Sequence, residues 1–246
     1  MMPNSPDPIE ILIRRLQRSA GLETSELAEL RNLPVDVHDV AKNETLAHEG
    51  ERVEQCILLL EGFLIRFQHT RDGKRQILSF YVPGDIPDLQ TLHLPTMDHS
   101  LATITPARIG RIPHKAMREL CHRNRRVADA LWRETLIDAA VARTWVRCVG
   151  RLTAHARVAH MLCELHARLD AVGLGEDPVP MPITQADFGD AMGLSVVQIN
   201  RTLRDLREEG LITLHRREMI VHDLPRLHHA AEFDPLYLHL DTRQRR

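Results

Sequence analysis

Apolar residues recur along the chain with two different periods, and the change between them divides the sequence into segments. Between Pro8 and Leu30 apolar positions fall three or four residues apart, which predicts two short packing helices. From Thr45 to Ile112 short β-rich runs alternate with turn residues. These runs are Cys56–Leu60, Leu64–Gln68, Gln76–Tyr81, Leu101–Thr105 and Ile109–Ile112. We therefore expect a barrel or roll of about five to eight strands.

Glycines punctuate this β-rich segment at positions 50, 62, 73 and 84, in steps of eleven or twelve residues. Turns between short strands often need a positive φ, which glycine adopts readily. Arg71-Asp72-Gly73-Lys74 is a candidate hairpin turn. The interior of such a roll has room for a small molecule or for side chains alone, and the pattern leaves both open.

A long helix is predicted from about Arg125 to Val149, where small and apolar residues alternate in steps of four and three. That is the repeat of a two-stranded coiled coil. The seam consists of Ala128, Trp132, Thr135, Ala139, Ala142, Val146 and Val149. At 1.5 Å per residue the helix is about 35–40 Å long, more than the roll alone can cover. We expect a parallel homodimer; the alternative is a seam that packs within the chain.

Gly150 interrupts this pattern, and a second helix is predicted from Ala154 to about Leu169. After a loop rich in Gly and Pro, the chain predicts a helix over Gln185–Met192, a turn at Gly193 and another helix after Ser195. This spacing is typical of a DNA-binding helix-turn-helix. Leu211–Leu214 and Met219–His222 then predict a β-hairpin of the wing type.

Polar and basic residues gather on the outward face of the second helix and at the start of the first, where they can bind phosphates or base edges. The candidate DNA-binding residues that this pattern indicates are Thr184, Gln185, Ser195, Gln198, Asn200, Arg201 and Arg204. A winged helix used for protein contacts is the alternative.

Composition narrows the class of protein. The chain has 246 residues, 43% of them apolar, and 32 basic against 34 acidic side chains give a formal net charge of −2. Such a chain can bury two modest cores, and a bulk polycation is excluded, so any DNA site is a local patch. No stretch approaches the roughly 20 apolar residues of a membrane span, and the four cysteines lack CxxC or disulfide-scaffold spacing. We expect a cytoplasmic protein with no membrane partner.

Several motifs together resemble the Crp/Fnr family of bacterial transcription regulators. They are Pro83-Gly84-Asp85, Arg157-Val158-Ala159, Gly193-Leu194-Ser195 and Glu209-Gly210-Leu211-Ile212. The segment from Gly84 to Gln90 and Phe233-Asp234-Pro235 are also similar to a subgroup common in alphaproteobacteria. The resemblance covers about residues 45 to 222.

The resemblance implies an α+β fold: a cyclic-nucleotide-binding-like β-roll, a long dimerisation helix and a C-terminal winged helix-turn-helix. The expected domains are N-terminal helices (1–44), a β-roll sensor (45–113), the dimerisation helix and hinge (114–150), a DNA-binding domain (151–223) and a C-terminal tail (224–246). The implied mechanism is a shift of the long helices and of a hinge at Gly150.

The implied function is a sequence-specific transcription regulator, not an enzyme, that binds a palindromic operator in double-stranded DNA as a homodimer and works with RNA polymerase. Residues matching the family's base-contacting positions are Val196, Val197 and Arg201. Arginine suits the O6 and N7 of guanine, whereas Val197 replaces a common glutamate and can contact a thymine methyl. The alternative is a haem- or small-ligand-binding sensor that acts through protein contacts.

The effector positions depart from the family pattern. Asp88 or Leu89 falls near the glutamate that binds ribose, and His99 with Ser100 replaces the Arg-Ser pair that binds the cyclic phosphate. A neutral imidazole replaces a guanidinium poorly, so binding of cyclic AMP is not expected. No cysteine precedes Cys56, which argues against an iron–sulfur cluster. The cofactor stays unassigned.

Histidines leave a haem or metal site as an alternative. His93 and His99 in the roll are candidates, as are His160, Cys163 and His166, which are spaced by threes on one predicted helix. Cys163 matches a core position of the family, and a buried apolar thiol accounts for it better. We therefore expect no metal site.

Overall fold

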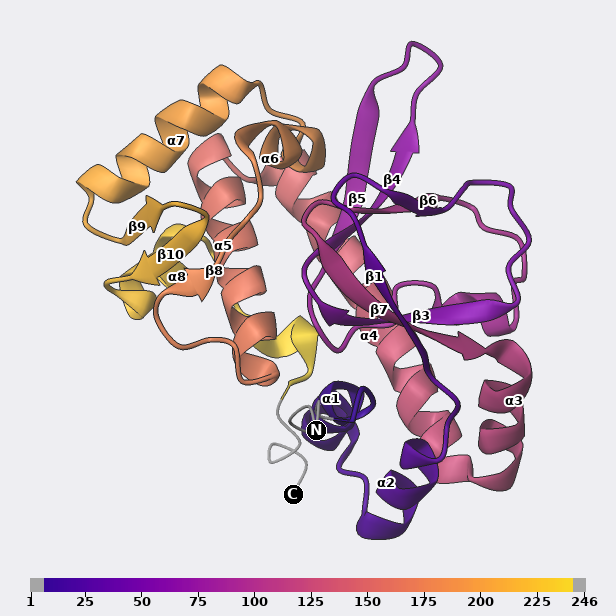
Figure 1. Ribbon diagram of the computed structural model, residues 1–246. Helices are drawn as coiled ribbons and strands as arrows, with labels where there is room; N and C mark the ends of the chain where they lie inside the picture. The colour runs from indigo at the N-terminus through magenta and orange to yellow at the C-terminus, as the bar shows by residue number, and fades with distance from the viewer. Residues whose placement is uncertain (1–6, 241–246) are drawn as a thin grey trace, which may run out of the picture. The chain divides into compact units, whose positions relative to one another are not determined.

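The computed structural model describes residues 7–240, which form two compact units (Figure 1). Among the described residues, the first unit comprises 7–66 and 81–136, and the second comprises 67–80 and 137–240. In this part of the chain no helix is both long and apolar enough to cross a membrane.

Two short helices begin the first unit, as the periodicity predicts. They are α1 (Glu10–Ala20) and α2 (Thr24–Arg31). Their apolar faces, with Leu12, Leu16 and Leu30, join a buried cluster that also contains residues of α3 (His114–Arg123) and the first turns of α4 (Arg125–Arg151). These helices therefore cover one face of the β-roll.

The β-roll consists of two antiparallel sheets, with strand orders β1-β7-β3 and β2-β6-β4-β5. The strands are β1 (Asp36–Val40), β2 (Thr45–Ala47), β3 (Gln55–Glu61), β4 (Leu64–His69), β5 (Arg75–Tyr81), β6 (Ser100–Thr103) and β7 (Ala107–Pro113). The five predicted strands correspond to β3–β7, and all four spaced glycines have positive φ.

The expectation that residues 1–44 form only helices is wrong, because this segment also contains strand β1. Its sequence, DVHDV, is mostly polar, and only Val40 is buried. β1 pairs on one side with β7 at the edge of its sheet, so most of its side chains need no apolar character. The apolar signal on which a strand prediction depends is therefore absent here.

Strand β3 shows why the roll has two cores. Cys56 and Leu58 belong to the cluster with the helices, whereas Ile57 and Leu59 belong to a second cluster with Leu101. Successive side chains of a strand point to opposite faces. β3 is consequently buried on both faces over residues 56–59.

Two boundaries after the roll differ from the prediction. Residues 114–150 hold a separate helix, α3, before α4, because Asn124 adopts an extended backbone and its side-chain oxygen accepts from the amide of Val127. Gly150 does not end the long helix, which continues to Arg151. The break lies at Thr153, whose hydroxyl accepts from the amide of Ala156 and caps α5 (Ala154–Ala171).

In the second unit, α5 packs against α6 (Gln185–Met192), α7 (Val196–Glu208) and α8 (Leu224–Ala230). A small antiparallel sheet has the order β8-β10-β9, with β8 (Val179–Pro180), β9 (Ile212–His215) and β10 (Glu218–Val221). The expected C-terminal tail, 224–246, instead contains α8 and a 3-10 helix, η2 (Pro235–Leu238).

A buried polar network holds this C-terminal segment to α5. Glu164 has no exposed surface, and its carboxylate accepts from Trp145 Nε1 (3.1 Å), the Tyr237 hydroxyl (2.7 Å) and Arg168 Nη1 (3.3 Å). Phe233 and Tyr237 contact the ring of His160. The family-like segment at Phe233 is thus part of a packed structure.

Candidate DNA-binding site

The helix-turn-helix is built by local signals in the sequence. The side chain of Thr184 accepts from the amide of Asp187, and the carboxylate of Asp187 accepts from the amide of Thr184, which makes a capping box at the start of α6. Gly193 ends α6 with φ 64° and ψ 38°. Ser195 and Gln198 form the capping box of α7. The predicted bounds of α6 and the positive φ at Gly193 are confirmed.

Close packing fixes the distance between the two helices. A methyl group added at Gly189 would lie 2.7 Å from the carbonyl oxygen of Leu194, closer than a real Cβ approaches. Ile199, Leu203 and Leu206 bury the inner face of α7. The turn is therefore tight, and the outer face of α7 is set by the packing of its inner face.

That outer face is exposed along its length. The exposed candidates on and beside α7 are Ser195, Val196, Val197, Gln198, Asn200, Arg201 and Arg204. Val197 exposes 78% of its surface. Arg201 and Arg204 make only long ion pairs one turn on, to Asp205 at 4.0 Å and Glu208 at 3.7 Å. Exposed pairs of this kind contribute about 0.3–0.5 kcal/mol, so both guanidinium groups can exchange partners.

Three candidates also have structural roles. Gln198 accepts through its side-chain oxygen from the amide of Ser195 at 2.9 Å, and Asn200 donates to the side-chain oxygen of Gln185 at 3.3 Å. The second bond ties α7 to α6. Thr184 is exposed and Gln185 is half-buried at the N-terminus of α6. The structure therefore brings the nine candidates onto α7 and the adjoining end of α6.

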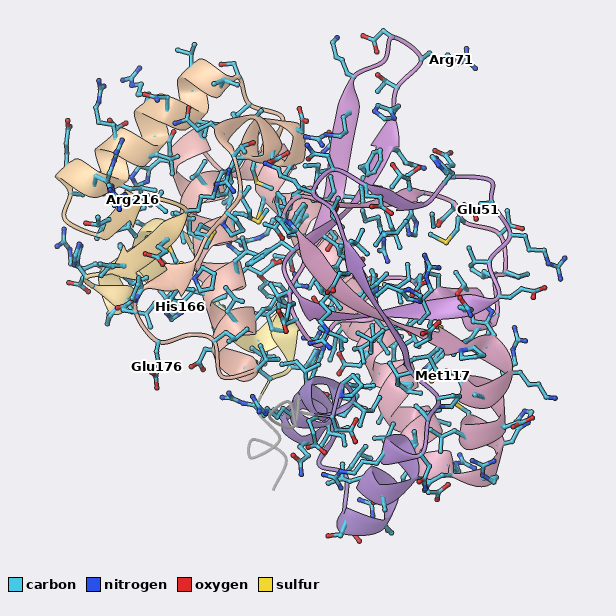
Figure 2. The ribbon with its side chains drawn as sticks, in the orientation of Figure 1. Glu51, Arg71, Met117, His166, Glu176 and Arg216 are labelled. Atoms are coloured by element: carbon cyan, nitrogen blue, oxygen red, sulfur yellow. The ribbon has the colours of Figure 1, made fainter. Side chains whose placement is uncertain are left out.

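Two basic residues at the tip of the wing were missed by the sequence analysis. Arg216 and Arg217 join β9 to β10 and have φ of 48° and 71°. Figure 2 labels Arg216 on this hairpin. The hairpin was predicted, but the backbone shape of its turn was not, because neither arginine is a residue that favours positive φ.

Arg75 on β5 is another residue that the sequence did not single out. Its guanidinium binds two carboxylates of α6, Asp187 at 2.6 Å and Asp190 at 2.8 Å. Gln76 donates to the carbonyl oxygen of Ala191 at 3.2 Å. These contacts lie within the second unit, and they connect the outer end of the β4–β5 hairpin to the first helix of the helix-turn-helix.

Helix α4 carries the predicted seam on an open face. Trp132 and Val146 expose 58% and 75% of their surface, and Val149 is also exposed. Ala139 and Ala142 are exposed, while Ala128 and Thr135 are half-buried. The large side chains of the seam therefore do not pack within the chain. Leu136 adds a further exposed apolar side chain that the heptad pattern did not include.

The four effector candidates each have contacts within the β-roll. Asp88 is buried, its carboxylate accepts from the amide of Ile57 at 2.9 Å, and burial raises its pKa to about 7. Leu89 joins the core cluster beneath the helices. His99 is buried with its Nδ1 2.6 Å from Asp98, and the hydroxyl of Ser100 accepts from the amide of Glu49. Asp88 also lines a cavity of the roll.

Two of the histidine and cysteine candidates, His160 and Cys163, occupy packed surroundings, whereas His93 is exposed and His166 is half-buried. Nδ1 of His160 donates to the carbonyl oxygen of Ala231 at 3.2 Å, and burial lowers its pKa to about 4. Cys163 is fully buried, which raises its pKa to about 12, as expected for a core thiol. Within residues 7–240 no group of three or more His, Cys, Asp or Glu side chains is arranged to hold a metal ion.

Comparisons with known proteins agree with this arrangement. Residues 37–124 match the family model of the cyclic nucleotide-binding domain, and residues 156–230 match that of the Crp-like helix-turn-helix domain. The chain is 26% identical over 230 residues to the transcriptional activator protein FnrL of Cereibacter sphaeroides, covering 90% of both chains. It is 28% identical over 215 residues to the nitrogen fixation regulation protein FixK of Bradyrhizobium diazoefficiens, covering 86% of this chain and 88% of the relative.

Among solved structures, FixK2 from Bradyrhizobium japonicum is similar at a TM-score of 0.74 and 25% identity, over 80% of this chain and 98% of that one. The order of roll, long helix and helix-turn-helix is thus shared along most of both chains. This chain belongs to the Crp/Fnr family and is a DNA-binding transcription regulator of that type.

Proposed function

We propose that the regulator acts as a homodimer on a palindromic operator, with half-sites about 34 Å apart, one turn of DNA. The observation that carries this proposal is the exposed apolar face of α4, where Trp132, Leu136 and Val146 lie open to solvent. A contiguous apolar stripe on a helix of 27 residues favours association with a second copy. Two copies then present two α7 helices.

The same proposal assigns roles to the exposed residues. α7 enters the major groove, where Arg201 donates to O6 and N7 of a guanine and Val197 contacts a thymine methyl. Arg204, Gln198, Asn200 and the N-terminus of α6 at Thr184 and Gln185 bind phosphates or flanking bases. Val197 exposes 78% of its surface, so its methyl groups are open to a contact with a thymine methyl.

The charge balance of the DNA-binding segment favours a DNA site that consists of a few contacts. Between residues 150 and 222 there are 8 arginines and no lysine, against 10 aspartates and glutamates. Non-specific binding through phosphates is therefore weak, and specific binding depends on the arginines of one helix face, doubled by the dimer.

We further propose that the bound dimer contacts RNA polymerase in the cytoplasm, that it has no catalytic activity and that cyclic AMP is not its effector. His99 is buried beside Asp98, and the carboxylate of Asp88 is engaged by the amide of Ile57. Neither position offers a free group suited to the ribose or to the cyclic phosphate. We propose no metal or iron–sulfur cofactor.

Selection of binding sites from random DNA, followed by electrophoretic mobility shift, tests the proposal. We expect an inverted repeat to be enriched and to bind two chains. If the purified protein selects no sequence at low salt, with or without cell extract, it acts through protein contacts instead and the operator proposal is wrong.

Arg201→Ala is expected to weaken binding to the selected operator by about 1–3 kcal/mol and to relax the base preference at one position of each half-site. Fluorescence anisotropy on operator and on random DNA measures both effects. Arg204→Ala is the matched control: as a phosphate contact, it weakens binding to both DNAs alike and lowers the salt dependence. An unchanged ratio of specific to random affinity in Arg201→Ala would contradict the guanine contact.

A further inference from the structure

The β-roll has a cavity that the DNA-binding function does not use. It has a volume of about 660 Å³ and lies among the loop 51–54, the ends of β3 and β7 and the first turn of α3. Glu51, on this loop, is labelled in Figure 2. Ligand pockets commonly have volumes of about 300–1,000 Å³, so this one has room for a small metabolite.

Four cationic side chains line the cavity: Arg52, Arg111, Lys115 and Arg118. They come from a loop, from β7 and from α3, so the fold gathers them from three parts of the first unit. Within residues 7–240 none of them forms an ion pair with a carboxylate, and Arg118 donates only to the carbonyl oxygen of Leu92, at 2.9 and 3.1 Å. Their charges are therefore not neutralised by direct ion pairs, although Arg111 acts electrostatically on the carboxyl of Asp88.

The backbone adds to this positive potential. Pro113 and His114 at the start of α3 line the cavity. In the described chain no side chain caps this helix, and no acidic residue lies in its first turn. The N-terminal amides of a helix and its dipole favour an anion. The amide of His114 donates to the carbonyl oxygen of Glu54, so it is the helix dipole that acts on the same space as the cations.

The acidic groups of the lining do not cancel this charge. They are Glu51, Glu54 and Asp88. Glu51 accepts from the amide of His48, and burial raises the pKa of Asp88 to about 7, so that carboxyl is partly protonated near neutrality. His114, which also lines the cavity, has its pKa lowered by burial, which favours its neutral form. The lining keeps a net positive charge.

We propose that this cavity is a binding site for a small phosphate monoester, held by Arg52, Arg111, Lys115 and Arg118 at the N-terminus of α3. Guanidinium groups match the oxygens of a phosphate in pairs, and a dianion gains most from several cations. The site shares Asp88 with the effector positions implied by the family, but Leu89, His99 and Ser100 are not part of its lining. It does not depend on DNA binding.

Titration of the full-length protein with inorganic phosphate and with methyl phosphate, by calorimetry and by phosphorus NMR, tests the site. We expect saturable binding, with sodium chloride at the same ionic strength as the blank. Arg52→Ala and Arg118→Ala are each expected to weaken the affinity at least tenfold. Both residues are exposed, so the variants should fold, which thermal unfolding verifies.

Two control variants show whether phosphate binds in this cavity or elsewhere on the protein. Lys42→Ala removes an exposed cation that is not in the lining and is expected to leave the affinity unchanged. Ser100→Ala alters the family's phosphate position and is also expected to have no effect. The proposal is overturned by an absence of saturable binding, or by binding that survives both arginine variants or is lost in Ser100→Ala. DNA is absent from the titration, so none of these results bears on operator binding.

Discussion

Replacing Glu164 by alanine is expected to lower the free energy of unfolding by about 3–5 kcal/mol. The carboxylate has no exposed surface and accepts hydrogen bonds from Trp145, Arg168 and Tyr237. Its removal breaks these three hydrogen bonds and takes from the guanidinium of Arg168, which is only 6% exposed, its ion pair with Glu164. Urea unfolding of the full-length protein, followed by tryptophan fluorescence, measures the loss.

The matched control is Glu176→Ala, in the exposed loop that follows α5. Surface substitutions of this kind change stability by no more than about 0.5 kcal/mol. If Glu164→Ala costs no more than the control, the network does not stabilise the protein. A double variant that also lacks Arg168 should cost less than the sum of the single variants, because the two residues interact directly.

The pH dependence of stability should differ between the wild type and Glu164→Gln. Burial raises the pKa of Glu164 above its ordinary 4.5, and this outweighs the opposing effect of Arg168. The folded state therefore holds this proton more tightly than the unfolded state does. The stabilisation that comes from this raised pKa is complete below the pKa of Glu164 in the unfolded chain. It is lost as the pH rises through the pKa of Glu164 in the folded protein. The difference in unfolding free energy between wild type and variant, measured at a series of pH values above 4.5, should show this decline, because groups such as Asp88 titrate in both proteins.

The helix-turn-helix could be predicted from the sequence because the signals that build it are local. Thr184, Gly193 and Ser195 each act on backbone groups within a few residues, and their spacing alone gives the bounds of α6 and the start of α7. The residues that share one face of α4 could be predicted equally well, since helical periodicity places residues on a face without knowledge of the rest of the fold.

The Glu164 network could not be predicted in the same way. Trp145 and Tyr237 lie 19 and 73 residues from Glu164, and no pattern along the chain connects them. The ion pairs of Arg75 with Asp187 and Asp190 are similar, with up to 115 residues between the partners. Such contacts depend on how elements pack, which propensity and periodicity do not determine.

The effector positions show why a resemblance to a family does not by itself locate a ligand site. A family pattern indicates where a ligand would bind if the side chains kept their roles. Here Leu89 packs into the core and Asp88 satisfies a backbone amide at the unpaired side of β3. The cations around the roll cavity, in contrast, come from segments that carry no motif, and only the folded chain brings them together.

Ala142→Glu in the seam of α4 is expected to dissociate the proposed homodimer. In a parallel pair the new carboxylates face each other across the two-fold axis, where neither finds a counter-ion in an apolar seam. Size-exclusion chromatography with light scattering should report the mass of one 28.1 kDa chain in place of two. Affinity for the selected operator should fall by at least about 100-fold. A monomer binds one half-site alone, whereas in the dimer the binding of one subunit holds the other close to the second half-site.

Arg143→Glu is the control for this result, since it places a carboxylate at the next residue of the same exposed helix but about 100° away around its axis. That variant is expected to remain dimeric and to keep its operator affinity. The far-ultraviolet circular dichroism of both variants should match the wild type, since residue 142 is exposed in the single chain. A monomeric wild type, or a dimeric Ala142→Glu with unchanged affinity, would place the interface elsewhere. The exposure of Trp132, Leu136 and Val146 would then require another partner for α4.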